Sequence, residues 1–187
     1  FAQESPAARP MAKAVKVIHP PSLDGQVLDD PVWQAIAPVT GFSQTGPDAG
    51  QPASEKTDVR IAYTADTIYF GVVCFDRNPS GQIVSDARRD SSMADTDSFR
   101  IILDTYHDGQ NGFVFGTTPA GVEYDGQVSQ EGVAVNPGPG GSGSGGGQGG
   151  GRQQAGSGGG FNLNWDGSWQ VQTTSTEAGW SAEFAIP

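Results

Sequence analysis

The chain has 187 residues, of which 21 are acidic and 10 are basic, and its formal net charge of −11 excludes a protein that binds nucleic-acid phosphates through a basic surface. No run of residues approaches the roughly 20 apolar positions of a membrane-spanning helix, so we expect no transmembrane segment. Cys74 is the single cysteine, which excludes an internal disulfide and a cysteine-based metal cluster.

The start of the chain predicts an exported protein. Residues 1–5, FAQES, resemble the region around the cut of a secretory signal, with a small residue near the cut and a polar start. We therefore expect a periplasmic or extracellular location. Residues 1–13 are rich in proline and alanine and predict a flexible leader, and residues 14–187 are expected to form a single domain.

Short alternating segments separated by turns dominate the rest of the chain. In residues 97–106, Phe99, Ile101 and Leu103 share one face of an expected strand, and polar residues precede and follow it. The expected strands cover residues 15–19, 57–64, 67–75, 98–105, 112–117, 122–129, 170–174 and 181–186. This pattern predicts an all-β fold, an antiparallel β-sandwich of the immunoglobulin or jelly-roll kind.

Residues 29–37 predict one short helix. Asp29 and Asp30 resemble an N-cap, Pro31 suits the first turn, and the helix is expected over residues 32–37 with Trp33 in the core. Cys74 is expected as a buried thiol. The residues expected in the core are Val59, Ile61, Phe70, Val72, Phe99, Ile101, Leu103, Phe113, Phe115 and Phe184.

A glycine-rich insertion spans residues 132–160, and its segment 137–160 holds fourteen glycines. Such a composition cannot build a core and is typical of a flexible extension. Ordering it costs roughly 1 to 2 kcal/mol per residue, which only a partner surface could offset. Residues 137–160 are therefore expected to be either a flexible hairpin extension or a docking element for a membrane-associated complex.

Five motifs occur in a fixed order along the chain. They are DGQVLDDPVWQ (24–34), DVRIAYTADTIYFGVVCFD (58–76), RRD (88–90) followed by DSFRIILDTYHD (97–108), TTPAG (117–121) before Asp125, and GWSAEFAIP (179–187). Together they resemble the family 9 carbohydrate-binding-module-like domain, in the version found at the N-terminus of large bacterial outer-membrane proteins. Leu23 and TTPAG depart from the usual Ile and NPxG. The resemblance implies a β-sandwich that binds a glycan and can hold calcium.

The candidate ligand-binding residues are Trp165, Arg88, Arg89 and Asp125. Trp165 lies between polar residues beside the glycine-rich insertion and could offer an aromatic plane to a sugar ring, whereas Trp33, Trp169 and Trp180 are expected in the core. Arg88 and Arg89 could bind a hydroxyl pair, or could tie their loop to Asp95 or Asp97. Asp125 could likewise bind the ligand, or could have only a structural role in a turn with Gly126.

Four aspartates are candidate calcium ligands because they fall at strand ends and loops, where hard carboxylate oxygens could converge. They are Asp95, Asp97, Asp104 and Asp108. No contiguous calcium-loop spacing is present, so the alternative is a solvated acidic surface.

No pattern of residues indicates catalysis, since neither histidine lies near a G-x-S-x-G nucleophile motif. We therefore expect a non-catalytic, secreted recognition or docking module whose ligand is a glycan. The alternative is a structural accessory subunit with a carbohydrate-binding-like fold, docked on the periplasmic or outer face of a larger membrane-associated protein complex.

Overall fold

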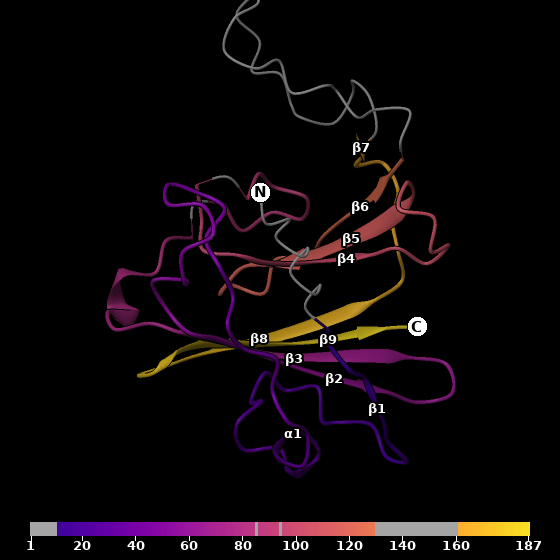
Figure 1. Cartoon of the computed structure of the whole chain (residues 1–187), viewed down its shortest axis with the longest axis horizontal. Coiled ribbons are helices and arrows are strands. Elements are labelled where there is room, and N and C mark those ends of the chain that lie inside the picture. The colour runs from indigo at the N-terminus through magenta and orange to yellow at the C-terminus, as the bar shows by residue number, and fades with distance from the viewer. Residues whose placement is uncertain (1–10, 85, 94, 130–160) are drawn as a thin grey trace, which may run out of the picture. The chain divides into compact units, whose positions relative to one another are not determined.

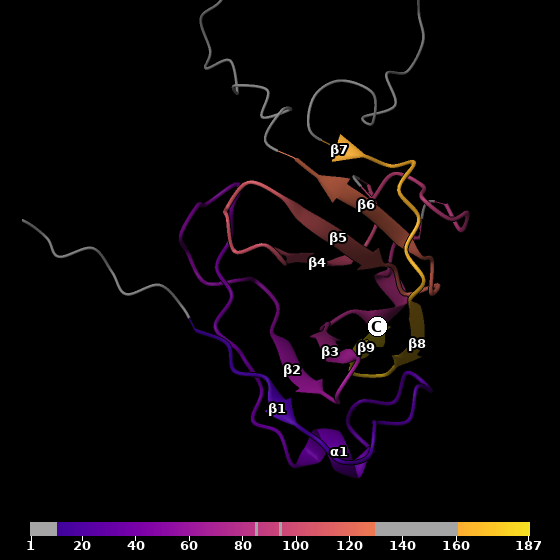
Figure 2. The same ribbon diagram turned by 90° about the vertical axis from the view of Figure 1, so that its right-hand side faces the viewer.

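The computed structural model describes residues 11–84, 86–93, 95–129 and 161–187. These residues form two sheets, with strand orders β1-β2-β3-β9-β8 and β4-β5-β6-β7 (Figures 1 and 2). The predicted all-β sandwich class, with two largely antiparallel sheets, is confirmed. No helix in these ranges is long and apolar enough to cross a membrane. Residues 137–160, and with them the prediction of a docking element, lie outside the described residues.

The chain divides into two compact units, each built around one sheet. Of the described residues, the first unit contains 11–83, 119–121 and 168–187, and the second contains 84, 86–93, 95–118, 122–129 and 161–167. The 3-10 helix η1 (Pro79–Gly81) belongs to the first unit.

The five-stranded sheet carries apolar rows that cross its strands. Its members are β1 (Val15–Lys16), β2 (Thr57–Tyr63), β3 (Ile68–Phe75), β8 (Gln170–Thr176) and β9 (Gly179–Ile186). All pairings are antiparallel except β1 with β2. The register aligns Ile61, Phe70, Phe184 and Val171 across four neighbouring strands, so the period of two in the sequence becomes one apolar face.

The opposite face of this sheet is covered by the segment that contains helix α1 (Pro31–Gln34), as Figures 1 and 2 show. The carboxylate of Asp30 caps the helix by accepting a hydrogen bond of 2.6 Å from the Val32 backbone N–H. Trp33 is fully buried in a cluster with Val27, Ile36, Ala62 and Val73. The predicted N-cap and the core position of Trp33 are confirmed.

Gly71 on β3 lets the indole of Trp33 lie directly on the sheet. A Cβ atom at this position would lie 2.8 Å from Cδ2 and Cε2 of Trp33 and 3.1 Å from Cγ1 of Val27. We expect Gly71→Ala to lower the free energy of unfolding by about 1 to 3 kcal/mol because the core is overpacked. Urea denaturation measures this loss. The loss should shrink in a Trp33→Leu background, and an equal loss in both backgrounds would show that the contact with the indole is not its cause.

The second unit holds a four-stranded meander. Its strands are β4 (Phe99–Leu103), β5 (Gly112–Thr117), β6 (Tyr124–Val128) and β7 (Phe161–Asn162), each antiparallel to the next. In β4, Ile101 is buried and Phe99 and Leu103 are half-buried, whereas Arg100 and Ile102 are exposed. The predicted alternation in this strand is therefore confirmed.

Several boundaries and burials differ from the expectations. The helix ends at Gln34 rather than at residue 37, and β1 ends at Lys16 rather than at residue 19. Strand β7 was not expected, because two residues are too few to show a period of two. Cys74 is half-buried, not fully buried, since it lies near the end of β3. Of the ten expected core residues, six are buried and four are half-buried: Ile61, Phe99, Leu103 and Phe113.

Candidate ligand-binding site

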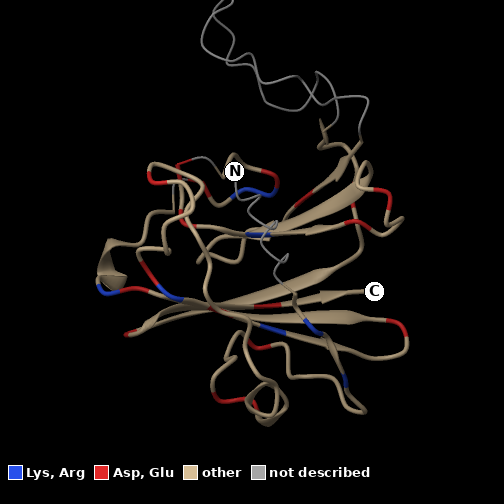
Figure 3. Cartoon of the chain, in the orientation of Figure 1, with Lys and Arg blue, Asp and Glu red and all other residues tan. Residues whose placement is uncertain are grey.

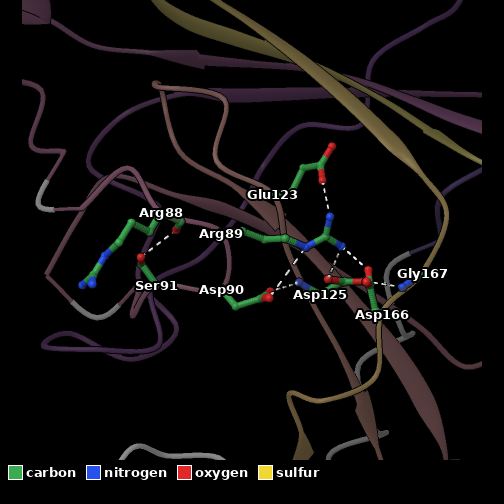
Figure 4. A network of polar contacts seen from close by, with 8 residues as sticks. All are labelled: Arg88, Arg89, Asp90, Ser91, Glu123, Asp125, Asp166 and Gly167. Atoms are coloured by element: carbon green, nitrogen blue, oxygen red, sulfur yellow. Dashed lines mark hydrogen bonds and ion pairs between the residues drawn. The ribbon is translucent and has the colours of Figure 1, made fainter.

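Arg89 lies at the centre of an ion-pair network in the second unit (Figure 4). Its Nη1 lies 2.6 Å from Oε2 of Glu123, and its Nη2 lies 3.1 Å from Oδ1 of Asp125 and 2.5 Å from Oδ1 of Asp166. Its Nε lies 3.7 Å from Oδ2 of Asp90. One guanidinium therefore holds together carboxylates from three separate parts of the chain.

A tight turn places Arg89 beside strand β6. The carbonyl oxygen of Arg88 accepts hydrogen bonds from the backbone N–H and the hydroxyl of Ser91. Asp90 adopts a positive φ of 58°, and its backbone N–H donates to the carbonyl oxygen of Glu123. The backbone N–H of Asp125 donates in return to the Asp90 carboxylate at 3.3 Å. These bonds fix the turn to β6, so the position of Arg89 is set before any ligand binds.

Asp125 is the buried member of the network, with 1% of its side chain exposed. It stands opposite Phe115 in the pairing of β5 with β6, which places a carboxylate on the same face of the sheet as this phenylalanine. Its Oδ1 accepts from Arg89, and its Oδ2 accepts from the Gly167 backbone N–H at 2.6 Å. Each carboxylate oxygen thus has a donor, as a buried charge requires.

The charges around Arg89 keep its guanidinium ionised. Partial burial lowers its pKa, but the hydrogen bond to Asp125 and the charges of Asp166 and Glu123 raise that pKa by more. Because four carboxylates surround one cation, the local charge of the network is negative.

Trp165 lies next to this network in the sequence and is half-buried. Its ring centroid is 4.6 Å from that of Phe113 and 5.9 Å from that of Phe115, so the indole covers part of β5. A Cβ atom on Gly167 would lie 2.7 Å from Cη2 of Trp165 and 3.3 Å from Oδ2 of Asp125. Glycine at 167 therefore allows the indole and the carboxylate to approach the same short loop.

Arg88 does not join Arg89, and Figure 4 shows the two side chains pointing in different directions. Nη2 of Arg88 lies 2.6 Å from Oδ2 of Asp86, and this pair is exposed. The hydrogen bonds from Arg88 hold the pKa of Asp86 well below its usual value. Arg89 is tied to Asp125, Asp166 and Glu123 rather than to Asp95 or Asp97. The structure thus brings together three of the four expected ligand-binding residues, Trp165, Arg89 and Asp125.

The expected calcium ligands do not converge. Asp95 and Asp97 are exposed, whereas Asp104 and Asp108 organise one loop. Asp104 accepts from the backbone N–H groups of Asp108 and Gly109, and Asp108 accepts from Gln110 and Asn111. The hydrogen bonds from Asn111 lower the pKa of Asp108. Within residues 11–84, 86–93, 95–129 and 161–187, no group of three or more His, Cys, Asp or Glu residues could hold a metal ion.

Sequence reasoning missed Glu123, Asp166 and Gly167. Acidic residues are frequent in this chain and fall mainly in loops and turns, as Figure 3 shows, so their presence near Trp165 carried little information. The available signal was the adjacency of Trp165, Asp166 and Gly167 in the segment after β7.

Comparison with known proteins gives no relative: no family model matches the chain, and neither the curated proteins nor the solved structures give a significant match.

Proposed function

We propose that the chain is a non-catalytic, secreted recognition module that binds a glycan at Trp165 and the Arg89 network. The observation that carries this proposal is the position of a half-buried indole in the same loop as a carboxylate, Asp166, that is 76% exposed and ion-paired to Arg89. The motif resemblance to family 9 carbohydrate-binding-module-like domains supports the same ligand class.

The proposed contacts follow from the chemistry of a sugar. The apolar face of a pyranose ring packs on the exposed part of an indole, and its hydroxyls donate to carboxylate oxygens. Asp166 and Glu123 offer such oxygens, because Arg89 contacts Oδ1 of the first and Oε2 of the second. Arg89 itself acts as a positioning residue, since its own donors already face carboxylates.

A protein partner is the second candidate, as for an accessory subunit of a membrane-associated complex. The observation in its favour is a pair of exposed apolar side chains in the second unit, Ile102 at 70% and Tyr106 at 68%. Exposed apolar side chains of this size occur at protein interfaces. The binding experiment below separates the two candidates.

We expect Asp166→Asn to weaken glycan binding by about 5- to 10-fold, because an exposed charged acceptor becomes a neutral amide at no cost to the core. Isothermal titration with cellotriose, xylotriose and maltotriose measures the affinity. The matched control is Asp86→Asn, which alters the exposed partner of Arg88 and should leave binding unchanged.

Trp165→Ala should abolish binding at this site in the same titration, and Trp165→Phe should retain part of it. Because Trp165 also packs on Phe113 and Phe115, the alanine variant loses stability as well, so its folding is checked by circular dichroism. Equal affinity of the wild type and Asp166→Asn would remove this network from the site. Failure of all three sugars to bind the wild type would favour the protein-partner function.

A further inference from the structure

Strand β4 forms one edge of the four-stranded sheet in the second unit (Figure 2). Among the residues that the structure describes, no strand pairs with its outer side. An edge strand presents a row of backbone N–H and C=O groups to which another strand can add, and proteins usually block such pairing with lysine, proline or an inward-pointing charge. The five residues of β4, FRIIL, contain none of these features.

The outward side of β4 carries a symmetric charge pattern. Arg100 and Ile102 are exposed on the strand, and Asp104, which directly follows it, is exposed as well. Ile102 is 70% exposed. A cation and a carboxylate therefore stand two residues before and two residues after an exposed apolar side chain. This pattern is complementary to itself when the strand is reversed about Ile102.

We propose that a second copy of this chain pairs with β4, antiparallel and about a two-fold axis at Ile102. In this register Ile102 packs on Ile102 of the second copy, and Arg100 stands opposite Asp104 of the second copy at both ends of the ladder. The inner face of the sheet continues as well, because buried Ile101 stands opposite half-buried Leu103 of the second copy. Each copy thus supplies a cation for a carboxylate of the other.

The neighbouring registers lack this match. An outward side chain stands opposite another outward side chain in a continuous sheet, so the axis can move only by whole residues. An axis at Ile101 would place Arg100 opposite Ile102, and an axis at Leu103 would place Ile102 opposite Asp104. Each of these arrangements sets a charge against an exposed isoleucine, so the charge pattern selects the register centred on Ile102.

Both charged groups can accept the new partner. Arg100 has five donors, of which Nη2 donates a long hydrogen bond of 3.3 Å to the carbonyl oxygen of Met93. Oδ1 of Asp104 accepts from the backbone N–H of Asp108, and Oδ2 accepts from that of Gly109. Since a carboxylate offers about four lone-pair sites, Asp104 can also accept from a guanidinium.

Long-range charge opposes the association, because each copy carries a formal net charge of −11. In about 0.15 M salt the Debye length is about 8 Å, which screens this repulsion more than it screens charges in contact. The ladder is also short, and small interfaces are typical of weak complexes. We therefore expect a weak, reversible dimer at this salt concentration.

The interface is independent of the proposed glycan site. Ile102 stands opposite Val114, whereas Asp125 stands opposite Phe115, so the two lie on opposite faces of the sheet. The inference therefore goes beyond the proposed function and can fail without it. A second copy over Ile102 would also account for part of the exposed apolar surface that favours a different protein partner.

Sedimentation equilibrium of the full chain, from about 1 µM to about 500 µM in about 0.15 M salt, measures the dimer. Arg100→Glu places like charges opposite each other at both ends of the ladder and should weaken dimerisation about 10-fold or more. The matched control is Arg77→Glu, which makes the same change of net charge at an exposed arginine of the first unit. It should leave the affinity within about 2-fold of the wild type.

A disulfide reports the register directly. In a Cys74→Ser background, which lacks the single native cysteine, Ile102→Cys brings two thiols opposite each other, within the Cα separation that a disulfide spans. Diamide, which oxidises thiols, should link this variant about 10-fold faster than Tyr106→Cys. Tyr106 is 68% exposed but lies beyond the end of the ladder, so its two copies are far apart.

Four results would overturn the proposal. They are a monomer at all of these concentrations, an equal loss of dimer in Arg100→Glu and Arg77→Glu, and linking of Ile102→Cys no faster than that of Tyr106→Cys. The fourth is protection of the β4 amides from hydrogen exchange in the monomer, which would show that another part of the chain covers this edge. In each case the sugar titrations would still decide the proposed function.

Discussion

Replacing Glu183 with alanine is expected to lower the free energy of unfolding by about 3 to 5 kcal/mol. Glu183 is fully buried on β9 and accepts three hydrogen bonds in the first unit. Oε1 accepts from Nε1 of Trp33 at 2.6 Å, and Oε2 accepts from the backbone N–H groups of Asp24 at 2.8 Å and Gly25 at 2.6 Å. Alanine would leave three donors without an acceptor, and urea denaturation measures the loss.

Two variants control this result. Gln172→Ala alters the exposed residue directly opposite Glu183 in the pairing of β8 with β9, and it should change the stability by less than about 0.5 kcal/mol. Glu183→Gln keeps the shape of the side chain but points its amide NH2 group at a hydrogen-bond donor. Its loss of stability should therefore fall between that of Gln172→Ala and that of Glu183→Ala. If Glu183→Ala were as stable as the wild type, these hydrogen bonds would not hold the segment before α1 to the sheet.

The stability contributed by Glu183 should depend on pH. Burial raises the pKa of Glu183, although the hydrogen bonds from Trp33, Asp24 and Gly25 lower it in part. A raised pKa means that the folded state binds the proton more tightly than the unfolded chain does. In the unfolded chain the glutamate titrates at about pH 4.3. The contribution is therefore complete below that pH and declines as the pH rises through the folded pKa. As the pH rises through the folded pKa, the wild type should therefore lose part of its advantage in stability over Glu183→Gln, which does not titrate.

Asp125→Ala is the second variant with a large expected effect, a loss of about 2 to 3 kcal/mol in the free energy of unfolding. The variant removes the buried partner of Arg89 and the acceptor of the Gly167 backbone N–H. The loss stays below that of a fully buried pair, because Arg89 is 41% exposed and water screens its charge. Urea is the suitable denaturant, since it does not screen ion pairs.

Asp125→Ala should also weaken ligand binding. Without the Asp125 acceptor, the loop that carries Trp165 and Asp166 loses its tie to β6, so the affinity for trisaccharides at this site should fall with the stability. Asp86→Ala is the control, because it breaks the exposed pair with Arg88 and should change neither quantity measurably. A stable Asp125→Ala variant with full affinity would show that the network does not position the loop.

The sequence by itself determined the class of fold and the direction of many side chains. The period of two places Ile101 and Ile102 on opposite faces of the sheet, because successive side chains of a strand point in opposite directions whichever strand it pairs with. The cap at Asp30 is likewise local, since its carboxylate bonds to a backbone N–H two residues away. Such features depend only on residues that are close in the sequence, so they can be predicted from the sequence directly.

Only the tertiary structure decided which polar residues meet. Arg88 and Arg89 are adjacent and alike, yet one pairs with exposed Asp86 and the other with buried Asp125, 36 residues away. Glu183 meets Trp33 across 150 residues. Strand register selects these partners, and so does the requirement that a buried charge has hydrogen-bond donors. Packing between distant parts of the chain meets this requirement, and the local sequence does not encode it.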